Sequence, residues 1–471
     1  MDEKQLIDEE LYKRSLHKKI EDEYGRGTLD AVLAHIAIYD ERFYLWLADL
    51  YDPGEYGEDG TPLGGGFYYS NSARDNEGYN IDIESTQQVL SFLSSSGMIK
   101  NFEGGYMEAI PEKVRRETVA FAKSLQSPED GYFYHPQWGK DIYIARLSRD
   151  LGWSTTLLAQ FGEKPYWDAP NGVAGSLGAP SIDKMAESAT ASEKYVEQLR
   201  SIDAWVEYLE SKRTEMKTKS YPIGHEIVSQ VRQVIAREKI AVERGELGTD
   251  GRPIADYDGD GVADNGFAMY VKKFFDSTQN VENGVWEENN SYNAVNGLMK
   301  IMFAYEQLGL PFNLADRAVK CAIDIILLDS EDVNGKIANN STDVYNPWIA
   351  ITRILDVVRK SNKDPALAAS LKATVKENAT DMVRVTTAKT LKFKKDDGSF
   401  GYTHSYSPAQ SQKAPAAVPY TVEGDVNGGV IAVTGVTRNM LNALGIDMPI
   451  YYRSDYEKFI ERLLGRKHIK K

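Results

Sequence analysis

Two stretches of the chain, FAKSLQSPEDGYF at residues 121–133 and FFDSTQNVENGVW at residues 274–286, share one frame. In each, four residues separate a glutamine from a glycine, and an aromatic residue stands two positions after the glycine. A glycine in a short polar segment marks a turn, because it reaches backbone conformations that other residues avoid. The matching positions are Phe121 and Phe274, Gln126 and Gln279, Gly131 and Gly284, and Phe133 and Trp286.

Weaker copies of this frame occur elsewhere, as GGGF at 64–67, EDVNGKI at 331–337 and DDGSF at 396–400. From Gly131 to Gly284 is 153 residues, three times the 51 residues from Gly284 to the glycine of EDVNGKI. A regular spacing of this kind indicates a repeated structural unit. The spacing predicts a period of about one helix pair.

The segments between these turns have the apolar periodicity of amphipathic helices, and alternating patterns typical of strands are scarce. The sequence therefore predicts an all-α fold of about six consecutive helix pairs. The expected pairs are 28–50 with 84–98, 111–126 with 139–161, 190–216 with 223–243, 267–279 with 289–308, 313–329 with 343–360, and 364–390 with 428–446.

The turn frame resembles the Gln-Trp repeat of squalene–hopene cyclases and their relatives, closely at 121–133 and 271–286 and in part elsewhere. The resemblance implies an (α/α)6-type toroid, in which outer helices alternate with inner ones around a central cavity. Toroids of this superfamily include terpenoid cyclases, protein prenyltransferases, glycosidases and polysaccharide lyases. The fold alone therefore does not define the chemistry.

The expected domain organisation has one main unit. Residues 1–27 form an N-terminal helical extension, residues 28–450 the toroid, and residues 451–471 a C-terminal helix with a basic tail. Within the toroid we expect a long loop at 163–189, which is rich in small residues and proline, and an Asp-rich loop at 256–266.

Composition excludes several partners. The chain has 471 residues and a formal net charge of −15, so we expect no nucleic-acid partner, because phosphate binding needs a basic surface. A locally basic cleft would still accept an anionic substrate. The single cysteine, Cys321, excludes an internal disulfide and a Cys-based zinc cluster. No run approaches the ~20 apolar residues of a membrane span, so we expect no membrane insertion.

Residues just after each turn should face the cavity, and polar groups interleaved with aromatic rings suit a carbohydrate, whose apolar faces stack on rings. A terpenoid cavity should instead be almost wholly apolar. The expected ligand-facing residues are Tyr134, His135, Gln137 and Trp138 after the second turn, Asp75 after the first, Trp286, Glu287, Asn290, Tyr292 and Asn296 after the fourth, and Tyr402 and His404 after the last.

The abundance of His, Tyr and Asn in these loops favours a β-eliminating lyase acting on a uronate-containing glycan. Such a lyase needs a base, an acid and groups that neutralise the carboxylate. We expect His135 as the base or acid, partnered by Tyr134 or Tyr292, with Asn290 and Arg146 on the carboxylate. Trp138 and Trp286 would stack on sugars.

A second resemblance bears on this chemistry. ENNSYNAVNG at 288–297 is similar to the Asn-Asn-His-Tyr stretch of alginate- and heparin-type lyases, but Ser291 stands at the expected histidine. A histidine would then come from another loop, and His135 is the leading candidate. His225, in SYPIGHEIVSQ, is interpreted instead as part of a helix cap.

Three alternatives remain open. A glycoside hydrolase needs paired carboxylates, for which Glu287 is a candidate together with Asp75, Glu77, Glu288, Glu423 and Asp425. A non-catalytic glycan-binding toroid is the second alternative. An isoprenoid cyclase or prenyltransferase is the third, and it is disfavoured because the Asp-x-Asp-Asp acid of squalene–hopene cyclases is missing and Cys321 lies in an apolar helix.

The stretch DYDGDGVADNG at 256–266 has alternate carboxylates and glycines, as at the start of an EF-hand-like calcium loop. The expected ligands are Asp256, Asp258, Asp260, Asp264 and the backbone carbonyl of Val262. Phe267 replaces the glutamate of the twelfth position, so a short structural Ca²⁺ loop is expected. Such loops favour a secreted or cell-surface protein, although the first twenty residues lack the apolar stretch of a signal peptide.

Overall fold

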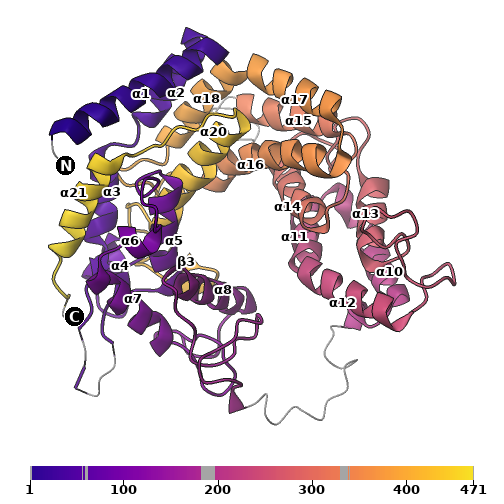
Figure 1. Ribbon diagram of the computed structural model, residues 1–471, viewed down its shortest axis with the longest axis horizontal. Helices are drawn as coiled ribbons and strands as arrows, with labels where there is room; N and C mark the ends of the chain where they lie inside the picture. Colours follow the sequence, from indigo (N-terminus) through magenta and orange to yellow (C-terminus); the bar gives the residue numbers. More distant parts are fainter. Residues whose placement is uncertain are drawn as a thin grey trace.

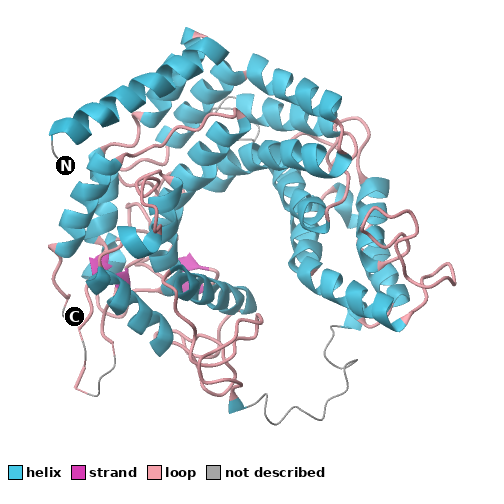
Figure 2. Ribbon diagram, viewed as in Figure 1, coloured by secondary structure: helices cyan, strands magenta, loops and turns pink. Residues whose placement is uncertain are grey.

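The computed structural model describes residues 3–55, 57–58, 62–181, 197–328, 338 and 340–469. This part of the chain is mostly helical, as the sequence predicts, and its strands form two short hairpins (Figure 2). None of the described helices is long and apolar enough to cross a membrane.

The helices are α1 (Glu3–Tyr24), α2 (Arg26–Ile36), α3 (Glu41–Asp49), α4 (Asn71–Asp75), α5 (Ile83–Ser95), α6 (Tyr106–Ala109), α7 (Glu112–Ser124), α8 (Ile144–Gln160), α10 (Ile202–Ser211), α11 (Ser220–Ser229), α12 (Val231–Arg244), α13 (Phe267–Thr278), α14 (Tyr292–Leu308), α15 (Ala315–Leu327), α16 (Ser341–Val357), α17 (Pro365–Glu377), α18 (Ala379–Leu391), α19 (Val426–Val430), α20 (Asn439–Ala443) and α21 (Arg453–Leu464). The 3₁₀ turns are η2 (Glu197–Leu199) and η3 (Glu215–Lys217), and the π-helical segments are η4 (Val358–Asn362) and η5 (Ile431–Arg438). The antiparallel hairpins pair β1 (Tyr51–Asp52) with β2 (Gly66–Phe67) and β3 (Gln410–Ser411) with β4 (Ala414–Pro415).

The helices lie in two layers that curve around the middle of the molecule (Figure 1). The inner layer is a series of contacting elements in the order α8, α5, α19–η5–α20, α16, α14 and α11. Along the chain an outer helix precedes each inner one: α3 before α5, α7 before α8, α10 before α11, α13 before α14, α15 before α16, and α18 before α19.

The first helices of the chain pack directly against the last ones. Helix α2 contacts α18, α3 contacts α21, and α5 contacts α19 and η5. The buried His35 of α2 links this region, with its ring nitrogens 3.0 Å from Thr387 Oγ1 and 2.8 Å from Thr437 Oγ1. Burial lowers the pKa of this imidazole to about 3, so it is neutral at physiological pH.

Two buried tryptophans join neighbouring helices. Trp205 of α10 donates from Nε1 to Phe267 O of α13 at 3.1 Å, and Trp348 of α16 donates to Thr386 Oγ1 of α18 at 3.0 Å. Both side chains are fully buried. A buried indole needs a partner for its N–H, and each of these finds one on a neighbouring helix. These two tryptophans therefore serve the core.

The two turns of the Gln–Gly frame have matching hydrogen bonds. Gln126 Nε2 donates to Gly131 O at 3.1 Å, and Gln279 Nε2 donates to Gly284 O at 2.8 Å. The glycines have φ values of 75° and 73°, in the left-handed region that favours glycine. The similarity noted in the sequence is thus a similarity of structure at these two turns.

Each of these turns is also tied to the segment that follows its inner helix. The first glutamine donates from Nε2 to Trp167 O at 2.8 Å, and the second donates to Asn313 O at 3.2 Å. A Cβ on Gly284 would lie 2.5 Å from the backbone nitrogen of Ala318 in α15. The frame therefore requires glutamine for the bond and glycine for the close approach.

The DDGSF copy forms a related but shorter turn. Lys395 N donates to Ser399 O at 2.8 Å, and Gly398 has a φ of 90°. Lys394 takes the place of the glutamine, and its Nζ donates to Ile38 O at 2.6 Å. This last turn is therefore joined to the start of the chain.

A further turn of this kind escaped the sequence analysis. Gly248 N donates to Arg252 O at 2.8 Å, and Gly251 has a φ of 73°. It has the Asp-Gly pair of the last turn without an aromatic residue after it. The GGGF copy at 64–67 belongs instead to the β1–β2 hairpin, and EDVNGKI at 331–337 lies outside the described residues.

Several segments predicted as single helices are divided, among them 28–50 into α2 and α3, 223–243 into α11 and α12, and 364–390 into α17 and α18. Between α11 and α12 Gln230 Nε2 donates to Glu226 O at 3.1 Å, and between α17 and α18 Asn378 Nδ2 donates to Thr374 O at 2.9 Å. A side-chain amide that binds this carbonyl competes with the backbone N–H and ends the helix.

Candidate functional site

His135, the predicted base, is held by backbone groups. Its Nδ1 accepts from Gln137 N at 3.2 Å, so Nε2 carries the proton and donates to Ile81 O at 2.7 Å. The side chain is 3% exposed, and burial lowers its pKa. Both ring nitrogens are therefore engaged, and neither is free to exchange a proton with a substrate.

Trp138 and Gln137 attach the same loop to β4. Trp138 Nε1 and Gln137 Nε2 both donate to Pro415 O, each at 2.9 Å. The indole also lies 4.3 Å from the His135 ring and 4.3 Å from the guanidinium carbon of Arg146. These contacts occupy the ring that was expected to stack on a sugar.

Tyr134 and Asp75 have local partners. The Tyr134 hydroxyl donates to Asp130 Oδ2 at 2.7 Å, within its own turn. Asp75 forms an ion pair with Arg74 at 2.6 Å, and its side chain is 57% exposed. The structure thus does not bring Tyr134 and His135 together around one free space.

Arg146, the predicted carboxylate ligand, already has three carboxylate partners in the protein. Its guanidinium nitrogens lie 3.0 Å from Asp82, 2.8 Å from Glu84 and 2.9 Å from Asp150. The side chain is fully buried. A buried charge needs such partners, and these three carboxylates occupy the guanidinium that was predicted to bind a substrate carboxylate. Arg146 is therefore a structural group in this protein.

The residues after the fourth turn support the neighbouring helices. Trp286 is 1% exposed and donates from Nε1 to Phe275 O at 2.9 Å, so it lies in the core and not against a ligand. Glu287 Oε1 accepts from Ser220 Oγ at 2.8 Å and from Ser220 N at 3.2 Å. Glu287 therefore caps the start of α11.

Asn290 and Tyr292 are likewise in contact with the protein. Asn290 Oδ1 accepts from Asn283 Nδ2 at 3.1 Å within the turn. Tyr292 is buried, and the ammonium of Lys389 lies 5.4 Å from its ring. Neither position places a free catalytic group beside the His135 loop.

Asn296 belongs to a buried chain of amides between α14 and α16. Its Nδ2 donates to Asp343 Oδ1 at 3.2 Å, and its Oδ1 accepts from Asn346 Nδ2 at 2.7 Å. The side-chain amide oxygen of Asn346, Oδ1, has no hydrogen-bond partner among the described residues. This chain fixes the two inner helices relative to each other.

Tyr402 and His404, after the last turn, lie at the edge of the same region. Tyr402 N donates to Asp425 Oδ2 at 2.7 Å, and its hydroxyl lies 3.3 Å from Thr342 Oγ1. The His404 ring packs at 4.3 Å on Phe393, and burial lowers its pKa. Another group of side chains, from three inner helices, was not predicted as a site.

That group, which we name the basic centre, consists of Arg149, Tyr221, His225 and Lys300. They come from the inner helices α8, α11 and α14 (Figure 1). The Tyr221 and His225 rings lie 6.4 Å apart and 11° from parallel, and Lys300 Nζ lies 5.7 Å from the Tyr221 ring. Tyr221 is 40% exposed and His225 is also exposed, so both rings are open to solvent.

The charges of this group act on His225 and Lys300. Burial lowers the pKa of His225, and the charges of Lys300 and Arg149 lower it further. Burial also lowers the pKa of Lys300, with the Arg149 charge as a second cause. Burial raises the pKa of Tyr221. At neutral pH the basic centre therefore places a neutral imidazole and a protonated phenol beside the side chains of Arg149 and Lys300.

Two glutamates, Glu84 and Glu287, support the basic centre. Glu84 is 3% exposed, and its two oxygens bind Arg149 at 2.6 Å and Arg146 at 2.8 Å. Glu287 fixes the first residue of α11, immediately before Tyr221. Two residues predicted to meet a ligand, Arg146 and Glu287, thus support the groups that are open to solvent.

The sequence contained one signal for this site. Tyr221 and His225 are four residues apart, a spacing that places both side chains on one face of a helix. The first-turn position of His225 suggested a cap instead. Arg149 and Lys300 carried no signal, because a charged residue in an amphipathic helix is expected on its solvated face.

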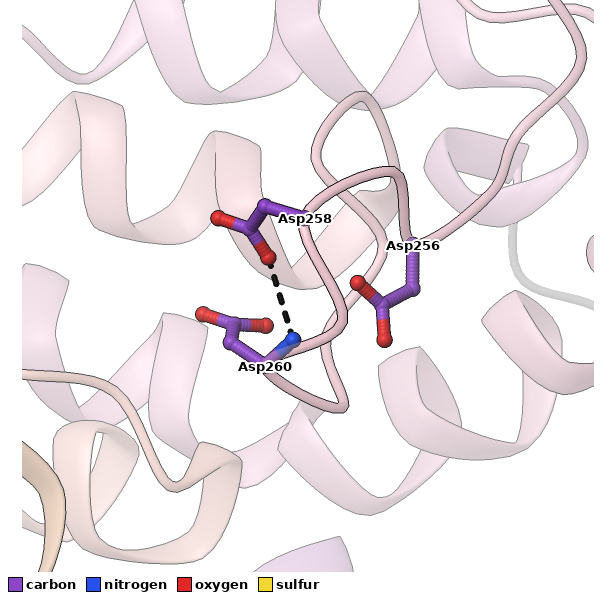
Figure 3. A group of neighbouring side chains, drawn as sticks. All are labelled: Asp256, Asp258 and Asp260. Atoms are coloured by element: carbon purple, nitrogen blue, oxygen red, sulfur yellow. Dashed lines mark hydrogen bonds between the residues drawn. The ribbon is translucent and has the colours of Figure 1, made fainter.

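The Asp-rich loop lies apart from the basic centre, between α12 and α13. One carboxylate oxygen each from Asp256, Asp258 and Asp260 lies within 4.8 Å of the others (Figure 3). Calcium binds oxygens at about 2.3–2.6 Å, so oxygens at this separation fit one ion. The three side chains are exposed, and these residues are able to hold a cation.

The other two predicted ligands have different positions. Asp264 Oδ2 accepts from Tyr257 N at 2.7 Å, and Asp264 is not part of the three-carboxylate group. Val262 N donates to Asp260 Oδ1 at 2.8 Å. Backbone N–H groups that point at the carboxylates partly offset their repulsion, and they lower the pKa of Asp256.

The basic centre is a group of side chains in this structure that is open to a ligand. It places two exposed rings and two cations on the inner layer of a chain whose net charge is −15. Comparisons with protein-family models, with curated proteins and with solved structures find no match to this chain.

Proposed function

We propose that the chain is a carbohydrate-active enzyme that cleaves a uronate-containing poly- or oligosaccharide by β-elimination at the basic centre. The observation that carries the proposal is the Tyr221–His225 ring pair beside Lys300, with Arg149 close enough for its charge to act on His225 and Lys300. Cations neutralise the uronate carboxylate, and amphipathic rings such as tyrosine suit the apolar faces of sugars. This polar and charged set also favours a sugar over an isoprenoid.

The proposed step begins with His225, whose lowered pKa leaves the imidazole neutral and able to accept a proton. It takes the proton from C5 of the uronate, while Arg149 and Lys300 stabilise the charge that develops on the carboxylate. The C4–O bond breaks, a C4–C5 double bond forms, and the phenol of Tyr221 donates a proton to the leaving oxygen. Proton transfer from imidazolium to phenolate restores both groups.

A glycoside hydrolase is the alternative, and the predicted carboxylates support it less well. Glu423 accepts from Ser70 Oγ at 2.8 Å and from Ser72 N at 2.8 Å. Asp425 is fully buried and accepts from Gly428 N at 2.7 Å. Carboxylates that are saturated by protein donors are poorly placed to protonate a glycosidic oxygen or to activate water.

The proposal extends to the fold, as a six-pair (α/α)6 toroid. The alternation of outer and inner helices along the chain supports it, as do the contacts of the first helices with the last. A toroid would place the basic centre on the wall of its central space.

The test is product analysis with a panel of polysaccharides that contain galacturonate, mannuronate, guluronate or glucuronate, beside neutral polymers. We expect oligosaccharides lighter by one water than hydrolysis fragments, with the ultraviolet absorbance of a double bond conjugated to a carboxylate. His225→Ala and Tyr221→Phe should each lower kcat by about 10²–10⁴-fold. The control variant His17→Ala, on the remote helix α1, should keep the wild-type rate.

Other products would contradict this reaction. Full-mass fragments would mean hydrolysis. Binding of an acidic glycan without any product, unchanged by time or enzyme concentration, would mean that the chain is a non-catalytic glycan-binding protein. Equal rates for His225→Ala and wild type would remove His225 from the mechanism.

We also propose that the Asp-rich loop binds a structural Ca²⁺ through Asp256, Asp258 and Asp260. The support is the approach of three carboxylate oxygens to within 4.8 Å on a loop that has glycine at two positive-φ positions. A hard cation that prefers oxygen ligands would screen the repulsion between these side chains. The ion would fix the loop that precedes α13.

A further inference from the structure

Beyond the basic centre, cationic and aromatic side chains continue along α14 and α16. Phe303 lies three residues after Lys300 in α14, so both side chains are on the same face. Lys300 Nζ lies 5.9 Å from the Phe303 ring, and Arg353 Cζ of α16 lies 3.5 Å from the same ring. Lys300, Phe303 and Arg353 thus form one continuous surface.

Arg353 lies further along α14 than Tyr221. The Tyr221 ring lies 5.7 Å from Lys300 Nζ, whereas Arg353 packs on Phe303, three residues after Lys300. Arg149 acts on both His225 and Lys300, and Arg353 also acts on Lys300. Arg353 therefore adjoins the basic centre through Lys300 and Phe303.

Arg353 keeps a hydrogen-bond donor available. Its side chain is 19% exposed and forms an ion pair with Glu306 through Nη1. Its Nε is buried and has no hydrogen-bond partner among the described residues. A guanidinium has five N–H donors, so a single carboxylate partner leaves others on the exposed part of the group for a ligand. A guanidinium offers two parallel N–H donors to a carboxylate.

We infer that the substrate is an extended acidic glycan that places one carboxylate at Arg149 and Lys300 and a second at Arg353. This inference rests on the proposed function and deepens it. A binding surface that continues past the reacting groups holds sugar units beyond the bond that breaks. The enzyme therefore cleaves within chains and binds longer acidic chains more tightly.

The test uses uronate oligosaccharides of defined length, from two to six units, prepared from the polymer that the wild type cleaves. For the wild type we expect KM to fall with length and early products of mixed size. Arg353→Ala should raise KM for the longest oligomer about tenfold, the size expected for one charge-assisted hydrogen bond, and leave kinetics with the shortest unchanged. Arg353→Lys should fall between these values.

Arg359→Ala is the matched control, because Arg359 is an arginine of the adjacent η4 with a 60% exposed side chain. It should behave as the wild type at every length. Equal KM values for Arg353→Ala and wild type at all lengths would overturn the inference and leave the proposed reaction standing. Release of only the shortest product by the wild type, from the earliest time, would also overturn it.

Binding separates the two proposals if turnover is missing. Calorimetric titration of the wild type with the two-unit and six-unit galacturonates should show an affinity that rises with length and is lost on Arg353→Ala. Length-dependent binding without any unsaturated product would overturn the reaction and support the two-carboxylate surface. Affinity independent of length would overturn the surface. If Arg353→Ala fails to fold, Arg353→Lys and the wild-type length series decide the question.

Discussion

Asp150 is buried on α8, where it accepts from Arg146 Nε at 2.9 Å. Burial raises the pKa of its carboxyl from 3.8 to about 7, although the Arg146 charge opposes the rise. The folded protein therefore holds this proton more tightly than the unfolded chain. The stability from this group is full below the unfolded pKa and is lost as pH rises through about 7.

We expect Asp150→Asn to remove this pH dependence, because an amide is neutral at every pH and its oxygen can still accept from Arg146. Between pH 5 and pH 8, the free energy of unfolding of the wild type should fall by about 2 kcal/mol relative to the variant. Urea unfolding at both pH values measures it. Asp203→Asn, an exposed change on α10, is the control, and parallel curves for Asp150→Asn and wild type would contradict the prediction.

At this scale the sequence identified kinds of residue better than their roles. His135 stood in the most aromatic loop, yet backbone groups of Ile81 and Gln137 take both of its ring nitrogens. Every residue other than proline has both of these backbone groups, so the residue types in a sequence do not predict which of them will bond to a side chain. His225 looked like part of a cap, because its exposure toward Lys300 and Arg149 depends on which way α11 faces. That orientation is set by contacts between distant helices.

At the scale of elements, the turn glutamines should contribute measurably to the free energy of unfolding. Gln279 is 7% exposed and donates to both Gly284 O and Asn313 O. Gln279→Ala would leave these two acceptors without this donor, so we expect a loss of about 1–3 kcal/mol in the free energy of unfolding. Chemical denaturation measures it. Gln233→Ala, on the exposed face of α12, should change stability by less than about 0.5 kcal/mol. Equal losses for the two variants would contradict a stabilising role of the two Gln279 hydrogen bonds.

The Asp-rich loop gives a second prediction at this scale. If it binds Ca²⁺, the ion should stabilise the folded state by about 2.7 kcal/mol at a concentration 100 times its Kd. Thermal unfolding with added calcium, and after chelation, measures the shift. Asp258→Ala should abolish it, whereas Asp381→Ala, an exposed change on α18, should retain it. A shift that survives Asp258→Ala would place the ion elsewhere.

Some of the turns and helix boundaries could be predicted from the sequence, and others could not. Glycines at fixed spacing marked the turns at 126–131 and 279–284, because only glycine fits their backbone and close packing. The breaks at Gln230 and Asn378 were not visible, since an amide that ends a helix and an amide on its surface look alike in one sequence. The turn at 247–253 lacked the aromatic residue that identified the others.

At the scale of the molecule, the all-α prediction is confirmed, because helical periodicity is a local property of the sequence. The pairing of distant helices is not local. The contact of His35 with Thr437 joins residues whose relation no spacing rule predicts. The toroid and the lyase reaction therefore stay proposals. The basic centre became recognisable only from the structure, because its side chains come from α8, α11 and α14, which are far apart in the sequence.

The packing of the first helices on the last has a consequence for synthesis. A ribosome makes α2 and α5 early, but the helices that cover them, α18 and α19, are made only near the end of translation. Lys394, which joins its turn to Ile38, likewise arrives more than 350 residues later. The N-terminal half of the nascent chain therefore keeps apolar surface uncovered until translation is nearly complete, which is the condition under which a growing chain is most exposed to aggregation.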